Sequence, residues 1–213
     1  MQNGLLYKLL YKPSIMLNIN LKCLYFSKEY TERELSNMLT SYKICGLLPG
    51  EIYGLVLKTK TGSRFTRKHL FETAMTKPQA VSSLHMEEVT THTATLGWVA
   101  PEGHSKLKAF NLILASNDHK REMAVKKMPD TIVISFDLND LEPATEYSLK
   151  VRTVCVFKQL KTMSEPREIK FRTKPEPPTN LTLETRFPNS FTISWDPTMV
   201  AATNHRYDIE KIF

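Results

Sequence analysis

The sequence has few of the residues from which catalytic and metal sites are built. Its three cysteines, Cys23, Cys45 and Cys155, form neither a CxxC pair nor the even set of a disulfide framework. Its six histidines lack HExxH or paired metal spacing, and we interpret all of them as surface or loop residues. The GxSxG, GxGxxG and P-loop motifs are also missing. We therefore expect no enzyme activity, no catalytic residue, no cofactor and no metal.

Long apolar segments are missing as well. No run of about 18 apolar residues occurs, so we expect no membrane span in this chain, although its parent protein can be anchored by other segments. Lys8 and Lys12 interrupt the apolar residues near the start, and no small-residue cleavage site follows, so the start does not resemble a signal peptide. Seven glycines in 213 residues exclude a collagen-like or low-complexity chain.

An internal repeat organises the residues that are present. The segments 47–57 and 141–151 both place Leu, Pro and Tyr at the same spacing, 94 residues apart. The matched positions are Leu47, Pro49 and Tyr53 in the first copy and Leu141, Pro143 and Tyr147 in the second. Because a repeated pattern of this length indicates a repeated structural unit, we expect more than one copy of one domain.

A second repeat marks the expected boundaries. Residues 93–98, which end in Trp98, resemble residues 190–195, which end in Trp195, 97 residues later. A proline-bearing junction precedes each of them, at 76–78 and 173–178. Proline stiffens a linker and cannot donate to a central strand ladder, so it suits a boundary. We therefore expect three units, at 1–77, 78–174 and 175–213.

Between the junctions the apolar residues alternate with polar ones. This period of two runs through residues 94–98, 110–114, 132–138 and 147–153, and it predicts an antiparallel sandwich with one face of each sheet buried. Only residues 28–39 offer a competing helical pattern. The repeat aligns them with a strand-and-loop region of the second copy, so we interpret them as strand and loop.

These motifs resemble the fibronectin type III module. That family has a buried Trp on its strand B and a Leu-x-Pro-x-Thr-x-Tyr corner entering strand F, matched here by Trp98 and by Leu141, Pro143, Thr145 and Tyr147. The resemblance implies that the Tyr147 phenol bonds to main chain a few residues upstream, and that removing it leaves a buried acceptor unpaired. An immunoglobulin domain would have Cys where Leu149 and Leu55 stand.

The resemblance implies an all-β fold of tandem immunoglobulin-like β-sandwiches of the fibronectin type III kind. Residues 1–77 would be N-terminally truncated and begin at about strand C, near 15–21, while 78–174 would be complete. Residues 175–213 would be C-terminally truncated, with a strand at 207–212, so we expect a fragment or an incomplete gene model. The expected structural core is Trp98, Leu141, Pro143, Tyr147, Leu47, Pro49, Tyr53 and Trp195, with Cys155 as a small inward residue of strand F.

Two sequence features are candidate binding or modification sites. Basic residues bracket 61–63, in the loop that would follow strand F of the first module: Lys58, Lys60, Arg64, Arg67 and Lys68. The corresponding family loop often carries ligand contacts, including the Arg-Gly-Asp site of fibronectin, but no Arg-Gly-Asp occurs here. This basic loop is either a patch for a polyanion such as a sulfated glycan or a solvated hairpin. Asn180 begins an Asn-Leu-Thr glycosylation sequon.

The resemblance also indicates a class of function. We expect a non-catalytic array for protein interaction or spacing, from the extracellular part of a cell-surface receptor or of a matrix or adhesion protein. Its protein ligands are unknown, and we expect no nucleic-acid partner. The junction at 175–183 is similar to those of tenascin-like proteins and receptor-type tyrosine phosphatases, so the chain can also be an ectodomain piece of such a phosphatase, without its catalytic domain. A cytoplasmic array of the muscle or cytoskeletal type is the other alternative.

Overall fold

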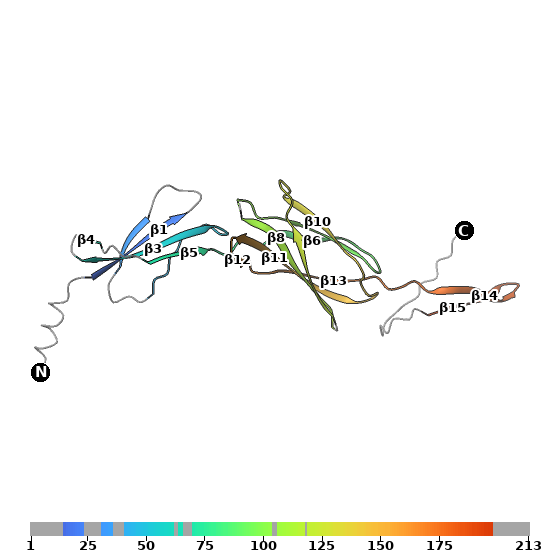
Figure 1. Ribbon diagram of the computed structural model, residues 1–213. Helices are drawn as coiled ribbons and strands as arrows, with labels where there is room; N and C mark the ends of the chain where they lie inside the picture. Colours follow the sequence, from blue (N-terminus) through green and yellow to red (C-terminus); the bar gives the residue numbers. More distant parts are fainter. Residues whose placement is uncertain are drawn as a thin grey trace, which may run out of the picture. The chain divides into compact units, whose positions relative to one another are not determined.

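The computed structural model describes residues 15–23, 31–35, 41–61, 64–65, 70–103, 106–117 and 119–197, with 15–35 and 59–65 described by backbone alone. These residues form antiparallel strands and no helix (Figure 1), which confirms the all-β prediction. The strand expected at 207–212 lies outside them. Contacts divide the chain into one compact unit of residues 1–80, 102–110 and 153–165 and a second of 81–101, 111–152 and 166–213.

The first unit contains a five-stranded sheet with β3 at its centre. β3 (Ile52–Thr61) pairs on one side with β1 (Ile15–Cys23), which in turn pairs with β2 (Thr31–Leu35). On its other side β3 pairs with β4 (Arg64–Phe65) and β5 (Leu70–Met75). β1 begins where the sequence predicted the first strand. β2 lies in the segment with a competing helical pattern, and its described residues are strand.

The second repeat forms two sheets. The first has the order β10-β7-β6, and the second has the order β12-β11-β8-β9, with β13 pairing β11 as well. The strands of the first sheet are β6 (Ser82–Val89), β7 (Ala94–Val99) and β10 (Val133–Leu138). Those of the second are β8 (Leu107–Ala115), β9 (Lys120–Lys126), β11 (Glu146–Phe157), β12 (Leu160–Met163) and β13 (Arg167–Arg172). The order β9-β8-β11-β13 repeats the order β2-β1-β3-β5, so the sequence repeat is also a repeat of topology.

Alternation explains which side chains enter the core of the second unit. Ala94, Leu96 and Trp98 of β7 are buried, as are Leu112 and Leu114 of β8 and Tyr147, Leu149 and Val151 of β11. The Tyr147 ring stacks on Phe171 of β13 at 5.5 Å between centroids. Ile132 departs from the predicted inward set, with 51% of its surface exposed. It precedes the first residue of β10, so the alternation of that strand does not govern it.

The last described strands form a hairpin of β14 (Thr179–Phe187) and β15 (Ser190–Asp196). This hairpin leaves large apolar side chains in solvent: Leu181 is 70% exposed, Phe187 66% and Phe191 67%. Trp195, which the sequence placed in a core, is partly buried. Among the described residues, the hairpin therefore has no second sheet layer over its apolar side chains.

Candidate functional site

Both copies of the Leu-Pro-Tyr motif form a tyrosine corner. The phenol oxygen of Tyr147 accepts a hydrogen bond from the main-chain N–H of Glu142 at 2.8 Å. The phenol oxygen of Tyr53 accepts one from the N–H of Leu48, also at 2.8 Å. The sequence analysis expected that loss of the Tyr147 phenol would leave a main-chain acceptor unpaired. In the structure the group that would lose its partner is a donor, the N–H of Glu142.

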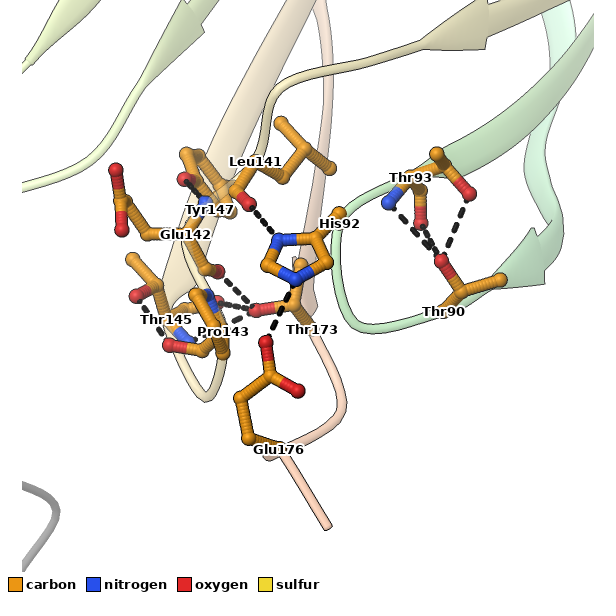
Figure 2. A network of polar contacts seen from close by, with 10 residues as sticks. All are labelled: Thr90, His92, Thr93, Leu141, Glu142, Pro143, Thr145, Tyr147, Thr173 and Glu176. Carbon is orange, nitrogen blue, oxygen red and sulfur yellow. Dashed lines mark hydrogen bonds and ion pairs between the residues drawn. The ribbon is translucent and has the colours of Figure 1, made fainter. Parts of the chain in front are cut away.

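A threonine that follows the last strand of each sheet closes the corner, as Figure 2 shows for Thr173 of the second copy. The hydroxyl of Thr173 accepts the N–H of Thr145 at 2.9 Å and donates to the carbonyl of Glu142 at 2.6 Å. In the first copy the hydroxyl of Thr76 accepts the N–H of Glu51 at 3.0 Å and donates to the carbonyl of Leu48 at 2.7 Å. Because each threonine follows the last strand of its sheet, it joins the end of that strand to the corner.

Sequence reasoning missed this role of the threonines. The signal was present, since Thr76 and Thr173 are each the first residue of a Thr-Lys-Pro junction. The proline of each junction indicates a boundary but gives no sign of this role. The repeat of the threonine at the same place in both junctions points to the shared hydrogen bonds.

His92 links the same corner to the segment that follows β13. Its Nδ1 lies 3.0 Å from the carbonyl oxygen of Leu141, and its Nε2 lies 2.7 Å from the Glu176 carboxylate (Figure 2). The hydrogen bond to the Leu141 carbonyl, followed by that to Glu176, raises the pKa of His92 above its ordinary value. The interpretation of His92 as a surface loop residue is correct for its position, but it missed these contacts.

The structure describes part of the basic loop. The backbone pairs Lys60 with Phe65 and Thr61 with Arg64, so the two limbs of this loop run beside each other as a hairpin. Lys58 is partly buried, and Arg67 and Lys68 lie outside the described residues. The backbone therefore brings Lys60 near Arg64, while a shared patch of side chains stays a prediction.

Asn180 of the sequon lies in β14 and is exposed. Its Nδ2 donates to the Asp196 carboxylate at 2.5 Å, and the hydroxyl of Thr182 shares a hydrogen bond with Ser194 at 2.7 Å. Both sequon side chains therefore bond across to β15. Attachment of a glycan would replace one of the two hydrogens on the Asn180 Nδ2, the atom that donates to Asp196.

Two buried ionisable groups lie in the first unit. Glu51 is buried, and neither carboxylate oxygen has a hydrogen-bond partner. Burial raises the pKa of Glu51, and the charge of Lys106 opposes that shift. The Cys155 thiol is also buried, and burial with a smaller effect of Glu51 raises its pKa to about 11. Cys45 is free and exposed.

The described residues contain little that resembles a small-molecule or metal site. No group of three or more His, Cys, Asp or Glu side chains among them is placed to hold a metal ion. A hollow of about 120 Å³ beside the tyrosine corner, lined by residues that include Leu114, Arg121 and Tyr147, is smaller than the few hundred Å³ of a usual ligand pocket. No helix in the described part is long and apolar enough to cross a membrane.

The sandwich topology and the tyrosine corner agree with a comparison of the sequence against protein families. Residues 77–170 match the family model described as "Fibronectin type III domain". The chain contains a fibronectin type III domain. It has Trp98 of β7 in its core and Tyr147 of β11 in its corner.

The similarity to known proteins extends beyond that domain. Tenascin-R of Rattus norvegicus is 28% identical over 171 residues, 80% of this chain, and Tenascin-N of Homo sapiens is 28% identical over 162 residues, 76% of this chain. The chain spans 12% of the length of each of these relatives. A solved two-domain fibronectin type III segment of chicken tenascin has a TM-score of 0.50 and 18% identity, covering 76% of this chain and 87% of that one. This last likeness concerns the fold alone.

Proposed function

We propose that this chain is a non-catalytic segment for protein interaction and spacing in an extracellular matrix or adhesion protein of the tenascin kind. The observation that carries the proposal is the duplicated tyrosine corner, with its closing threonine in both copies. It indicates that residues outside 77–170 repeat the same module, as expected of an array. The similarity to tenascins over 76–80% of the chain supports this.

The proposed array keeps the boundaries predicted from the sequence, at 1–77, 78–174 and 175–213. Residues 78–174 bury apolar side chains from two sheets, whereas the hairpin of 179–196 exposes Leu181, Phe187 and Phe191. We expect an excised 78–174 to melt cooperatively and 175–213 to show no cooperative melt in circular dichroism. A cooperative melt of the second piece would contradict these boundaries.

Localisation tests the main proposal. An antibody against residues 78–174 should label the surface of unpermeabilised cells of the source tissue, and the antigen should be retained in the matrix after detergent extraction. Antigen found only after permeabilisation, in cytosolic or myofibrillar fractions, would contradict the proposal and favour an intracellular array. Glycan at Asn180 in the native protein would add support, since N-glycans are added in the secretory pathway.

We also propose a sulfated polymer as one ligand of the first repeat, through the basic loop. The antiparallel pairing of Lys60 with Phe65 and of Thr61 with Arg64 favours it, because both limbs of the loop lie side by side. Clustered positive charge attracts polyanions, and the attraction weakens as salt screens it.

Heparin-affinity chromatography of the full chain tests this ligand. The variant Arg64→Ser, Arg67→Ser, Lys68→Ser should elute at lower salt than wild type. The matched control changes three exposed lysines of the second unit to Ser and removes the same charge: Lys120, Lys126 and Lys170. If both triple variants elute together, the effect is one of net charge, and the loop is a solvated turn.

A further inference from the structure

The two contacts of the His92 ring restrict its protonation state. Both partners are acceptors: the carbonyl oxygen of Leu141 faces Nδ1 at 3.0 Å, and the Glu176 carboxylate faces Nε2 at 2.7 Å. A neutral imidazole has one N–H donor and one bare nitrogen, whereas the imidazolium has two donors. With Glu176 ionised, only the imidazolium makes both hydrogen bonds, because a bare nitrogen facing either oxygen has no proton to donate.

The position of this ring gives the protonation a structural effect. His92 lies in the turn between β6 and β7, Leu141 belongs to the tyrosine corner, and Glu176 follows β13 (Figure 2). We propose that His92 is a pH-sensitive latch: its protonated ring holds Glu176 against the tyrosine corner through its charge and both hydrogen bonds, and loss of one ring proton removes the charge and one of the two bonds, which frees the segment that begins at Pro175.

The charges around the ring favour the protonated form. The segment after β13 contributes Glu176, and the corner contributes Glu142, whose charge also acts on the ring. The β6–β7 turn contributes the hydroxyls of Thr90 and Thr93, which bond to each other. Lys174 contributes its main-chain N–H, which donates to the carbonyl of Thr90 at 3.0 Å.

The direction of the pH dependence follows from the sign of the shift. The hydrogen bond to Leu141 first, and that to Glu176 second, raise the pKa of His92 above its ordinary value of 6.5. A group with a raised pKa in the folded state stabilises that state fully below its unfolded pKa and loses the effect as the pH rises through the folded pKa. The latch is therefore closed at mildly acidic pH and opens as the pH rises above 6.5 through the folded pKa of His92.

Opening of the latch leaves the domain itself intact. The N–H of Thr173 donates to Thr145, and the N–H of Lys174 donates to Thr90, at 3.1 and 3.0 Å. The N–H of Ala144 donates to the carbonyl of Lys174 at 3.1 Å. These bonds involve no titrating group, so the chain stays fixed as far as Lys174 at either pH. Release is confined to residues from Pro175 onward.

NMR of the full chain labelled with ¹⁵N tests the latch between pH 5.5 and 9. We expect the His92 ring to titrate above pH 6.5, with both ring nitrogens protonated at pH 6. The Glu176 amide should be ordered at pH 6 in ¹⁵N relaxation and become mobile by pH 9. Glu176→Gln, a change of a partly exposed side chain that keeps an acceptor and removes the charge, should lower the pKa of His92.

Two further variants separate the latch from a general effect of pH. His92→Gln should leave the Glu176 amide mobile at both pH values, whereas the control His119→Gln should behave as wild type. A His92 ring that titrates at or below 6.5, a Glu176 amide equally ordered at pH 6 and 9 in wild type, or an unchanged His92 pKa in Glu176→Gln would each overturn the proposal.

Discussion

Thr76 and Thr173 occupy the same place in two copies of one hydrogen-bond pattern. Each hydroxyl accepts the main-chain N–H of the residue two before a corner tyrosine and donates to the carbonyl of the residue five before it. Each threonine N–H also returns to the carbonyl of the residue whose N–H its hydroxyl accepts, at 3.0 and 3.1 Å. In each copy, one threonine thus joins the last strand of the sheet to the corner through its side-chain hydroxyl and its main-chain N–H.

Removal of the Thr173 hydroxyl should weaken the domain. Thr173→Val keeps the shape of the side chain but leaves the N–H of Thr145 and the carbonyl of Glu142 without this partner, at a cost of about 1–3 kcal/mol. Urea unfolding, followed by Trp98 fluorescence in a Trp195→Phe background, measures the loss. Thr131→Val is the control, because its hydroxyl makes one long local bond of 3.4 Å, and it should change stability by less than about 0.5 kcal/mol.

Tyr147→Phe should also destabilise the domain, by about 1–3 kcal/mol, because it leaves the N–H of Glu142 without its acceptor. The phenylalanine ring retains the stack on Phe171, so the loss reports the hydrogen bond. Tyr42→Phe makes the same chemical change at an exposed tyrosine and should be neutral in the same urea titration. Equal stability of Tyr147→Phe and wild type would contradict the energetic importance of the corner.

Glu51 stands where the second repeat has Thr145, and its buried carboxylate should lower stability as the pH rises. Its raised pKa means that the folded state holds the proton more tightly than the unfolded chain, so stability falls as the pH increases from 4.5. We expect Glu51→Thr to melt at a higher temperature than wild type at pH 7.5, with a smaller difference at pH 4. A difference that is constant across this range would show that the Glu51 carboxyl does not titrate with folding.

Cys155 should resist modification while Cys45 reacts. The Cys155 thiol is buried with a pKa of about 11, so at pH 8 it is both inaccessible and protonated, whereas thiolate is the reactive form. Peptide mapping after a short iodoacetamide pulse should find Cys45 alkylated and Cys155 intact, and urea should remove the protection. Equal alkylation of the two without urea would contradict the burial of Cys155 in β11.

The sequence predicted the repeated features well because local pattern determines them. Strand alternation places Leu96 and Trp98 in the core, and the spacing of Leu141 and Tyr147 is typical of the corner. The predicted direction of the tyrosine hydrogen bond was wrong, because residue types do not reveal whether the phenol contacts a main-chain N–H or a carbonyl.

Contacts between distant segments were the features that could not be predicted. His92 and Glu176 are 84 residues apart, and neither belongs to a motif. Their contact depends on how the turn after β6 and the end of β13 meet at one end of the sandwich. The burial of Glu51 likewise depends on its surroundings in the first unit, because an isolated Glu in a turn is expected in solvent.

The His92–Glu176 contact also affects how the chain extends under a pulling force. A force that pulls on the residues after Glu176 meets this ion pair before it reaches the hydrogen bonds of Lys174. With the pair broken, Pro175 and Glu176 join the extensible linker and add about 7 Å of extended chain, at about 3.3–3.6 Å per residue. This junction would then provide a short length of chain that is held at acidic pH and becomes extensible at alkaline pH, without unfolding of a domain.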